Sequence, residues 1–116
     1  MRKEFSIVLG LAAIAAAPAA AKDRMGLQAI ASGDFGAAER TLVAERRIFP
    51  GRPELMLNLA AVYRQTGRVA AARDLYTEAA SAPDVMLALP NGGTASSRDL
   101  ASAALARLAG TETASR

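Results

Sequence analysis

Residues 53–86 read PELMLNLAAVYRQTGRVAAARDLYTEAASAPDVM, and the apolar residues of this stretch follow a helical period twice. Spacings of i, i+3, i+4 and i+7 place the first run on one helical face: Met56, Leu59, Ala60 and Tyr63. The period restarts after Gly67 with a second run: Val69, Ala72, Tyr76 and Ala79. Gly67 suits the left-handed backbone conformation that ends one helix before the next begins. Because the connection is so short, the two helices are predicted to lie antiparallel.

The preceding stretch repeats this pattern 34 residues earlier in the chain. Gly33 corresponds to Gly67, and small and large residues recur in their own positions. The other matched pairs are Met25 and Leu59, Gly26 and Ala60, Ala29 and Tyr63, Phe35 and Val69, Ala38 and Ala72, and Leu42 and Tyr76. Pro50, Gly51 and Pro53 interrupt the helical pattern between the two units. The repeat predicts an all-α fold of stacked helical pairs, each burying its apolar face against its neighbour.

The second unit resembles the tetratricopeptide repeat family. Seven of its residues fall on the signature positions of that family: Leu59, Ala60, Tyr63, Gly67, Ala72, Tyr76 and Ala79. The first unit is similar to the family more loosely, through Gly33, Asp34, Phe35, Ala38, Leu42 and Pro50. The resemblance covers Lys22 to about Asp84. It implies a module that binds other proteins through a surface built by its repeats.

The chain after the second unit departs from the repeat. Pro90-Asn91-Gly92-Gly93 breaks any helix, and its apolar and β-prone flanks predict a short β-hairpin or an extended crossover. A helix follows, with a capping box at residues 96–99 and an apolar stripe that ends at Gly110, and we expect it to cap the second unit. The predicted domain therefore spans residues 22–110. It contains units at about 22–52 and 53–86, a capping segment at 87–110 and then a frayed tail at 111–116.

Residues 1–21 have the layout of a secretory signal peptide. Arg2 and Lys3 precede an apolar run, and Ala19-Ala20-Ala21 leads into a charged segment. The alternative is a retained membrane anchor, but the apolar run is shorter than the roughly 20 residues that a spanning helix needs. We expect cleavage after Ala21, a mature chain without a membrane span, and a periplasmic or secreted location. No cysteine follows the cleavage site, which excludes attachment through a lipidated N-terminal cysteine.

The composition argues against an enzyme. The chain has no Cys and no His, so it lacks thiol nucleophiles, imidazole bases and the ligands of the usual zinc sites. We expect no catalytic residue, no metal and no cofactor. The net charge of +3 is distributed among mixed charges, as where arginines at positions 40, 46, 47 and 52 alternate with glutamates at 39, 45 and 54. This mixing predicts a solvated helix face and no nucleic-acid partner, with a weak site for anionic headgroups or acidic partners as the alternative.

The resemblance also implies where a partner binds, because the first helices of successive tetratricopeptide-like pairs line a concave groove. Carried onto this sequence, the groove residues are Leu27, Ile30, Leu57, Asn58, Ala61, Arg64 and Gln65. Arg64 and Asn58 are expected to hydrogen-bond a protein or peptide partner, although packing and solvation are the alternative roles for these two side chains. A second function stays open. Two units are fewer than the roughly three that such arrays usually need, so the chain is alternatively a structural subunit that forms a homodimer or joins a larger envelope assembly.

Overall fold

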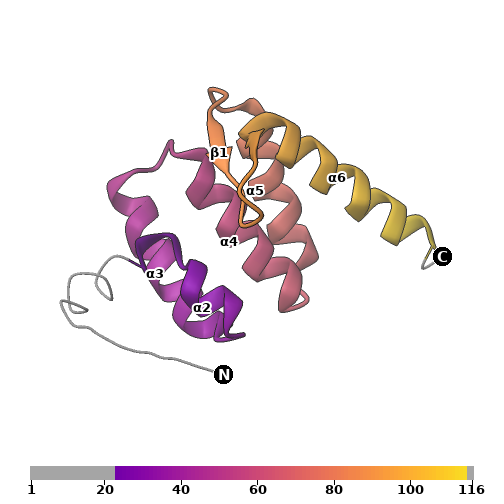
Figure 1. The fold of residues 1–116 in the computed structure, drawn as a ribbon. Coiled ribbons are helices and arrows are strands. Elements are labelled where there is room, and N and C mark those ends of the chain that lie inside the picture. The colour runs from indigo at the N-terminus through magenta and orange to yellow at the C-terminus, as the bar shows by residue number, and fades with distance from the viewer. Residues whose placement is uncertain (1–22, 115–116) are drawn as a thin grey trace, which may run out of the picture.

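The structure is a computed structural model that describes residues 23–114 of the chain. The expected signal peptide at residues 1–21 lies outside the described residues, as do residues 115–116. The described chain is helical apart from one β-hairpin, and the elements curve from the N-terminal helices to the C-terminal helix (Figure 1). This architecture confirms the predicted all-α fold class. Within the described part, no helix is both long and apolar enough to cross a bilayer.

The second unit is an antiparallel pair formed by α4 (Pro53–Gln65) and α5 (Val69–Ser81). Gly67 lies in the turn between them with a φ of 82°, which confirms the predicted left-handed glycine. Ala60 and Ala72 are fully buried, so small side chains occupy the interior positions that the repeat predicts. Tyr63 is only half-buried, because its ring lies at the protein surface beneath the guanidinium of Arg68, 4.5 Å away.

The first unit pairs a broken helix with the longer α3 (Phe35–Ile48). A 3-10 turn, η2 (Asp23–Met25), precedes the short α2 (Leu27–Ala31), and Gly26 between them has a φ of 66°. Gly26 lies so close to α3 that a Cβ atom there would come within 3.1 Å of the Leu42 side chain. The Asp23 carboxylate replaces a helix cap by accepting hydrogen bonds from the backbone N–H groups of residues 28 and 29. Gly33 has a φ of 80° and occupies the turn equivalent to Gly67, as predicted.

Polar contacts join the two units at the surface as well as in the core. Arg68 donates hydrogen bonds of 2.7 and 3.0 Å to the two carboxylate oxygens of Glu39, and these bonds hold the pKa of Glu39 below its ordinary value. Arg46 donates a hydrogen bond of 3.1 Å to Glu78. Both pairs reach from α3 to residues of the second unit, so the charges that the sequence predicts on a solvated face also connect the repeats.

The β-hairpin occupies the position where the sequence predicts a hairpin or a crossover. β1 (Met86–Ala88) pairs antiparallel with β2 (Thr94–Ser96), with Leu87 opposite Ala95. The hairpin leads directly into α6 (Ser97–Ala114), which packs against α5 through Ala101, Ala104 and Leu108. The expected end of this helix at Gly110 is wrong, because α6 continues to Ala114. Gly110 does not adopt a positive φ, and no proline follows to stop the helix.

A compact hydrogen-bond network fixes the base of the β-hairpin to the start of α6. Asp84 accepts hydrogen bonds from the Ser96 hydroxyl at 2.6 Å and from the Arg98 backbone N–H at 3.0 Å, and these bonds lower the pKa of its carboxyl group. The fully buried Ser97 bonds Val85 through its backbone N–H and its hydroxyl oxygen. Ser96 also caps α6 by accepting a hydrogen bond from the Asp99 backbone N–H, at the predicted capping box. The network therefore sets the orientation of β1 relative to the helices.

A candidate protein-binding groove beside the β-hairpin

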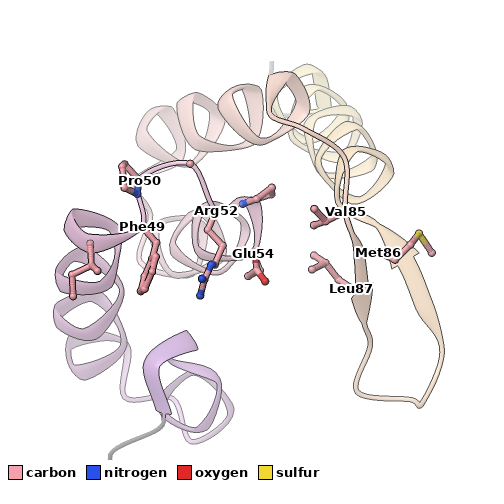
Figure 2. Close-up of a pocket in the computed structure, with 10 residues that line it drawn as sticks. Phe49, Pro50, Arg52, Glu54, Val85, Met86 and Leu87 are labelled. Carbon is pink, nitrogen blue, oxygen red and sulfur yellow. The ribbon is translucent and has the colours of Figure 1, made fainter.

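A hollow of about 680 Å³ lies between the loop that joins the two units and the first residues of the β-hairpin. One wall is formed by residues 48–54 and the other by residues 85–87. Figure 2 shows Phe49 and Arg52 on one side and Val85 and Leu87 on the other, with Met86 pointing away. Pro50 and Pro53 restrict the backbone of the first wall, and the Asp84 network holds the second.

This hollow continues along the helices through two further hollows. The middle one, of about 220 Å³, is bordered by Met25, Leu27, Glu54, Asn58, Leu87 and Ala88. The last one, of about 570 Å³, is bordered by Leu27, Ile30, Ala31, Ala88, Leu89 and Pro90. Neighbouring hollows share lining residues on both sides, so together they form one continuous depression, which we call the hairpin groove. One side of it is made by the helices and the inter-unit loop, and the other by residues 85–90.

Exposed apolar side chains concentrate in the hairpin groove. Among the described residues, five large hydrophobic side chains are exposed: Leu27, Ile48, Phe49, Val85 and Met86. All five residues border the hairpin groove, although the side chain of Met86 points away from it (Figure 2). Exposed apolar area gathered in one depression is typical of a binding surface, whereas single exposed hydrophobic residues need no special explanation.

The hairpin groove carries little charge. Among the residues that line its three hollows, Arg52 and Glu54 are charged, and they have opposite signs. The Arg52 guanidinium lies 4.1 Å from the centroid of the Phe49 ring, which keeps this arginine over an apolar surface. Across the described residues, no group of three or more acidic side chains is placed to bind a metal ion. The hairpin groove therefore offers apolar contact and backbone groups for recognition.

Three of the predicted partner-binding residues line the hairpin groove, namely Leu27, Ile30 and Asn58. The Asn58 side-chain amide donates a hydrogen bond of 2.9 Å to the carbonyl oxygen of Met25. This bond connects the first helices of the two units, which is the packing role that the sequence left as the alternative. The amide oxygen of Asn58 remains an acceptor beside the groove.

The other four predicted residues, Leu57, Ala61, Arg64 and Gln65, lie outside the hairpin groove. Leu57 and Ala61 are half-buried, and Leu57 packs against the core. Arg64 and Gln65 are exposed at the C-terminal end of α4, whereas the hairpin groove lies beside its N-terminal end. The structure thus divides the predicted site between the hairpin groove and the remainder of α4.

The residues that complete the hairpin groove come from segments outside the regular repeat. Phe49 follows the last residue of α3, Val85 directly precedes β1, and Leu87 lies in β1. The apolar run at residues 85–89 is the sequence feature that could have indicated this wall. An isolated two-stranded hairpin cannot bury so many apolar residues by itself, so some of them must face another part of the protein or a partner. The sequence predicts the hairpin itself but not the surface that it faces.

The comparison with protein families agrees with this architecture. A family model for the tetratricopeptide repeat matches residues 29–84, the segment that holds most of the first unit and the whole second pair. No curated protein and no solved structure was found to match the chain. Repeats of this type generally mediate contacts between proteins and are typically non-catalytic. The match and the two stacked helical pairs together support a tetratricopeptide-like fold for this part of the chain.

Proposed function

We propose that this chain is an exported adaptor that binds a segment of a partner protein in the hairpin groove. The observation that carries the proposal is that all five residues with exposed large apolar side chains, among those described, border this one groove, although the side chain of Met86 points away from it (Figure 2). The two charges in the lining have opposite signs, which suits a largely apolar protein segment and not a polyanion such as nucleic acid. The role is therefore binding, with no chemical step.

Export is the second part of the proposal. It rests on residues 1–21, in which two basic residues, a short apolar run and three alanines follow the order of a signal peptide. We expect the intact mass of the protein from a periplasmic extract to correspond to a chain that begins at Lys22. A product of full length that fractionates with the membrane would contradict export in soluble form and would support the membrane anchor.

The groove is tested by capture of the partner from an envelope extract on the immobilised protein. We expect Phe49→Asp and Leu27→Asp to reduce capture by at least about thirtyfold, because a charge placed among central apolar contacts costs 2 kcal/mol or more. Phe49 and Leu27 are exposed by 37% and 58%, so both variants are expected to melt like the wild type. Thermal melts before the capture experiment check this condition.

Arg64→Ala is the matched comparison, because Arg64 is an exposed member of the sequence-predicted site at the other end of α4. Loss of capture in Phe49→Asp but not in Arg64→Ala is the expected result. The reverse pattern would move the contact to the C-terminal end of α4. Capture that survives all three substitutions, together with a dimeric mass in solution, would favour the structural-subunit function over the adaptor.

A further inference from the structure

The backbone of β1 has a free edge. The Leu89 N–H donates to the Gly93 carbonyl at 2.8 Å, and the Ser97 N–H donates to the Val85 carbonyl at 2.7 Å. In an antiparallel pair, residues directly opposite each other alternate between pairs that exchange backbone hydrogen bonds and pairs that do not. These two bonds and the register of Leu87 opposite Ala95 show that residues 85, 87 and 89 direct their backbone groups toward β2. The N–H and C=O groups of Met86 and Ala88 therefore point away from β2, toward the outer edge of the hairpin.

This outer edge borders the hairpin groove. Met86 and Ala88 both line its hollows, and the side chain of Met86 points away from the groove in Figure 2. Met86 must then border the groove through its backbone. The side chains of Val85 and Leu87 point across the first hollow toward its opposite wall (Figure 2), and the free edge runs along the border of this hollow at about a right angle to them. Among the described residues, no backbone hydrogen bond joins Met86 or Ala88 to another element. Pro90 has no N–H group and ends the edge at the hairpin tip.

We propose that the occupant of the hairpin groove is an extended peptide segment of a partner protein, which pairs with the outer edge of β1 as a third strand. The proposal rests on the proposed function and adds the conformation of the bound segment. Strand addition would satisfy the free backbone groups of Met86 and Ala88, which an apolar surface cannot do. The first hollow, of about 680 Å³, is within the range of roughly 300–1,000 Å³ that is usual for ligand clefts.

Strand pairing also predicts the sequence pattern of the segment. Side chains directly opposite each other in a sheet point to the same face. Residues of the added strand that lie opposite Val85 and Leu87 would therefore point with them into the hairpin groove, and the residues between would point outward with Met86. The segment should carry apolar residues at alternate positions.

A second copy of this chain is the competing occupant. Pairing of two β1 edges would join only three residues from each copy. Such a contact would bury far less than the roughly 800 Å² per partner that a stable interface needs. We therefore favour a peptide segment, which would pair with β1 and also contact the apolar lining of the hairpin groove.

The proposal is tested with fluorescently labelled heptapeptides that carry Val, Ile or Phe at positions 2, 4 and 6 and Ser or Lys elsewhere. Control peptides have the same composition with the apolar residues contiguous. Affinity for the purified protein is measured by fluorescence anisotropy. We expect the alternating peptides to bind more tightly, and N-methylation of their backbone amides to weaken binding at every second position only, because alternate amides face β1.

Two proline variants test the edge itself. Ala88→Pro removes an N–H from the outer edge of β1, and Thr94→Pro removes the N–H of the residue directly opposite, on the outer edge of β2. We expect Ala88→Pro to weaken peptide binding by about tenfold, through loss of the hydrogen bond that this N–H would donate, and Thr94→Pro to change it by less than about twofold. Circular dichroism checks that both variants keep their helices.

The outcomes separate this proposal from the function on which it rests. Equal effects of the two proline variants, or no binding by any alternating peptide, would overturn strand addition. So would a dimer in solution that Ala88→Pro converts to a monomer, which would make a second copy the occupant. If partner capture is lost in Phe49→Asp but kept in Ala88→Pro, the groove function stands and strand addition fails. If Phe49→Asp keeps capture, the groove function itself fails.

Discussion

Leu59→Ala is expected to lower the free energy of unfolding by about 2–5 kcal/mol. Leu59 is 2% exposed and lies in the continuous core that joins the two helical pairs. Truncation removes apolar contacts and leaves a cavity that the surrounding helices fill only in part. Because a small domain is stable by only about 5–15 kcal/mol, this single change removes a large fraction of its stability. Urea unfolding followed by circular dichroism measures the change.

Leu27→Ala is the control for this measurement, since it makes the same chemical change at a side chain that is 58% exposed. We expect it to cost less than about 1 kcal/mol, because surface substitutions away from special features are nearly neutral. If the two variants unfolded at the same urea concentration, Leu59 would not be a core residue and the helical faces described here would be wrong.

Gly26→Ala is expected to be about as destabilising, with a cost of about 2–5 kcal/mol. Two effects add at this position. Its φ of 66° is left-handed, which costs an alanine about 1–2 kcal/mol. The new Cβ atom would also lie 3.1 Å from the Leu42 side chain, which is fully buried and has little room to move. Thermal and urea unfolding measure the total.

Gly67→Ala separates the two effects. Gly67 has a φ of 82°, and a Cβ atom there would meet nothing within 4 Å. This variant should therefore lower the free energy of unfolding only by the backbone term, about 1–2 kcal/mol. A Gly26→Ala cost no greater than that of Gly67→Ala would show that α2 moves away from α3 without penalty. The close contact of the first unit would then contribute nothing to stability.

The helical pairs could be predicted from the sequence because their determinants are local and repeated. Gly33 and Gly67 mark two equivalent turns, and the apolar spacing identifies the buried face of α4 and α5. The break in the first helix at Gly26 was harder to predict from the sequence, because a glycine at that position also fits an unbroken helix that packs closely against its neighbour. The close approach of Gly26 to Leu42 involves α3, which follows later in the chain. The end of α6 was missed because Gly110 is tolerated within the helix at modest cost.

The candidate site was predictable only in part. Leu27, Ile30 and Asn58 follow from their position on the first helices, which is a property of the repeat. The opposite wall depends on how the β-hairpin folds back, and that is set by the contacts of Asp84 and Ser97 across more than ten residues. Such a contact has no periodic signal in the sequence. Phe49 and Val85 lie on opposite sides of the groove only as a result of this tertiary arrangement (Figure 2).

Because the β-hairpin follows directly after the second unit, the width of the hairpin groove depends on the number of repeats in the chain. One wall, Phe49 to Glu54, lies at the start of the second unit, and the other, Val85 to Leu87, follows directly after that unit. A single helical pair therefore separates the walls. Because adjacent helices pack roughly 8–10 Å apart, insertion of another pair between them would move the walls apart by at least that distance and open the cleft. Lengthening an array of this kind usually enlarges its binding surface, whereas in this protein it would open the groove that we propose for partner binding.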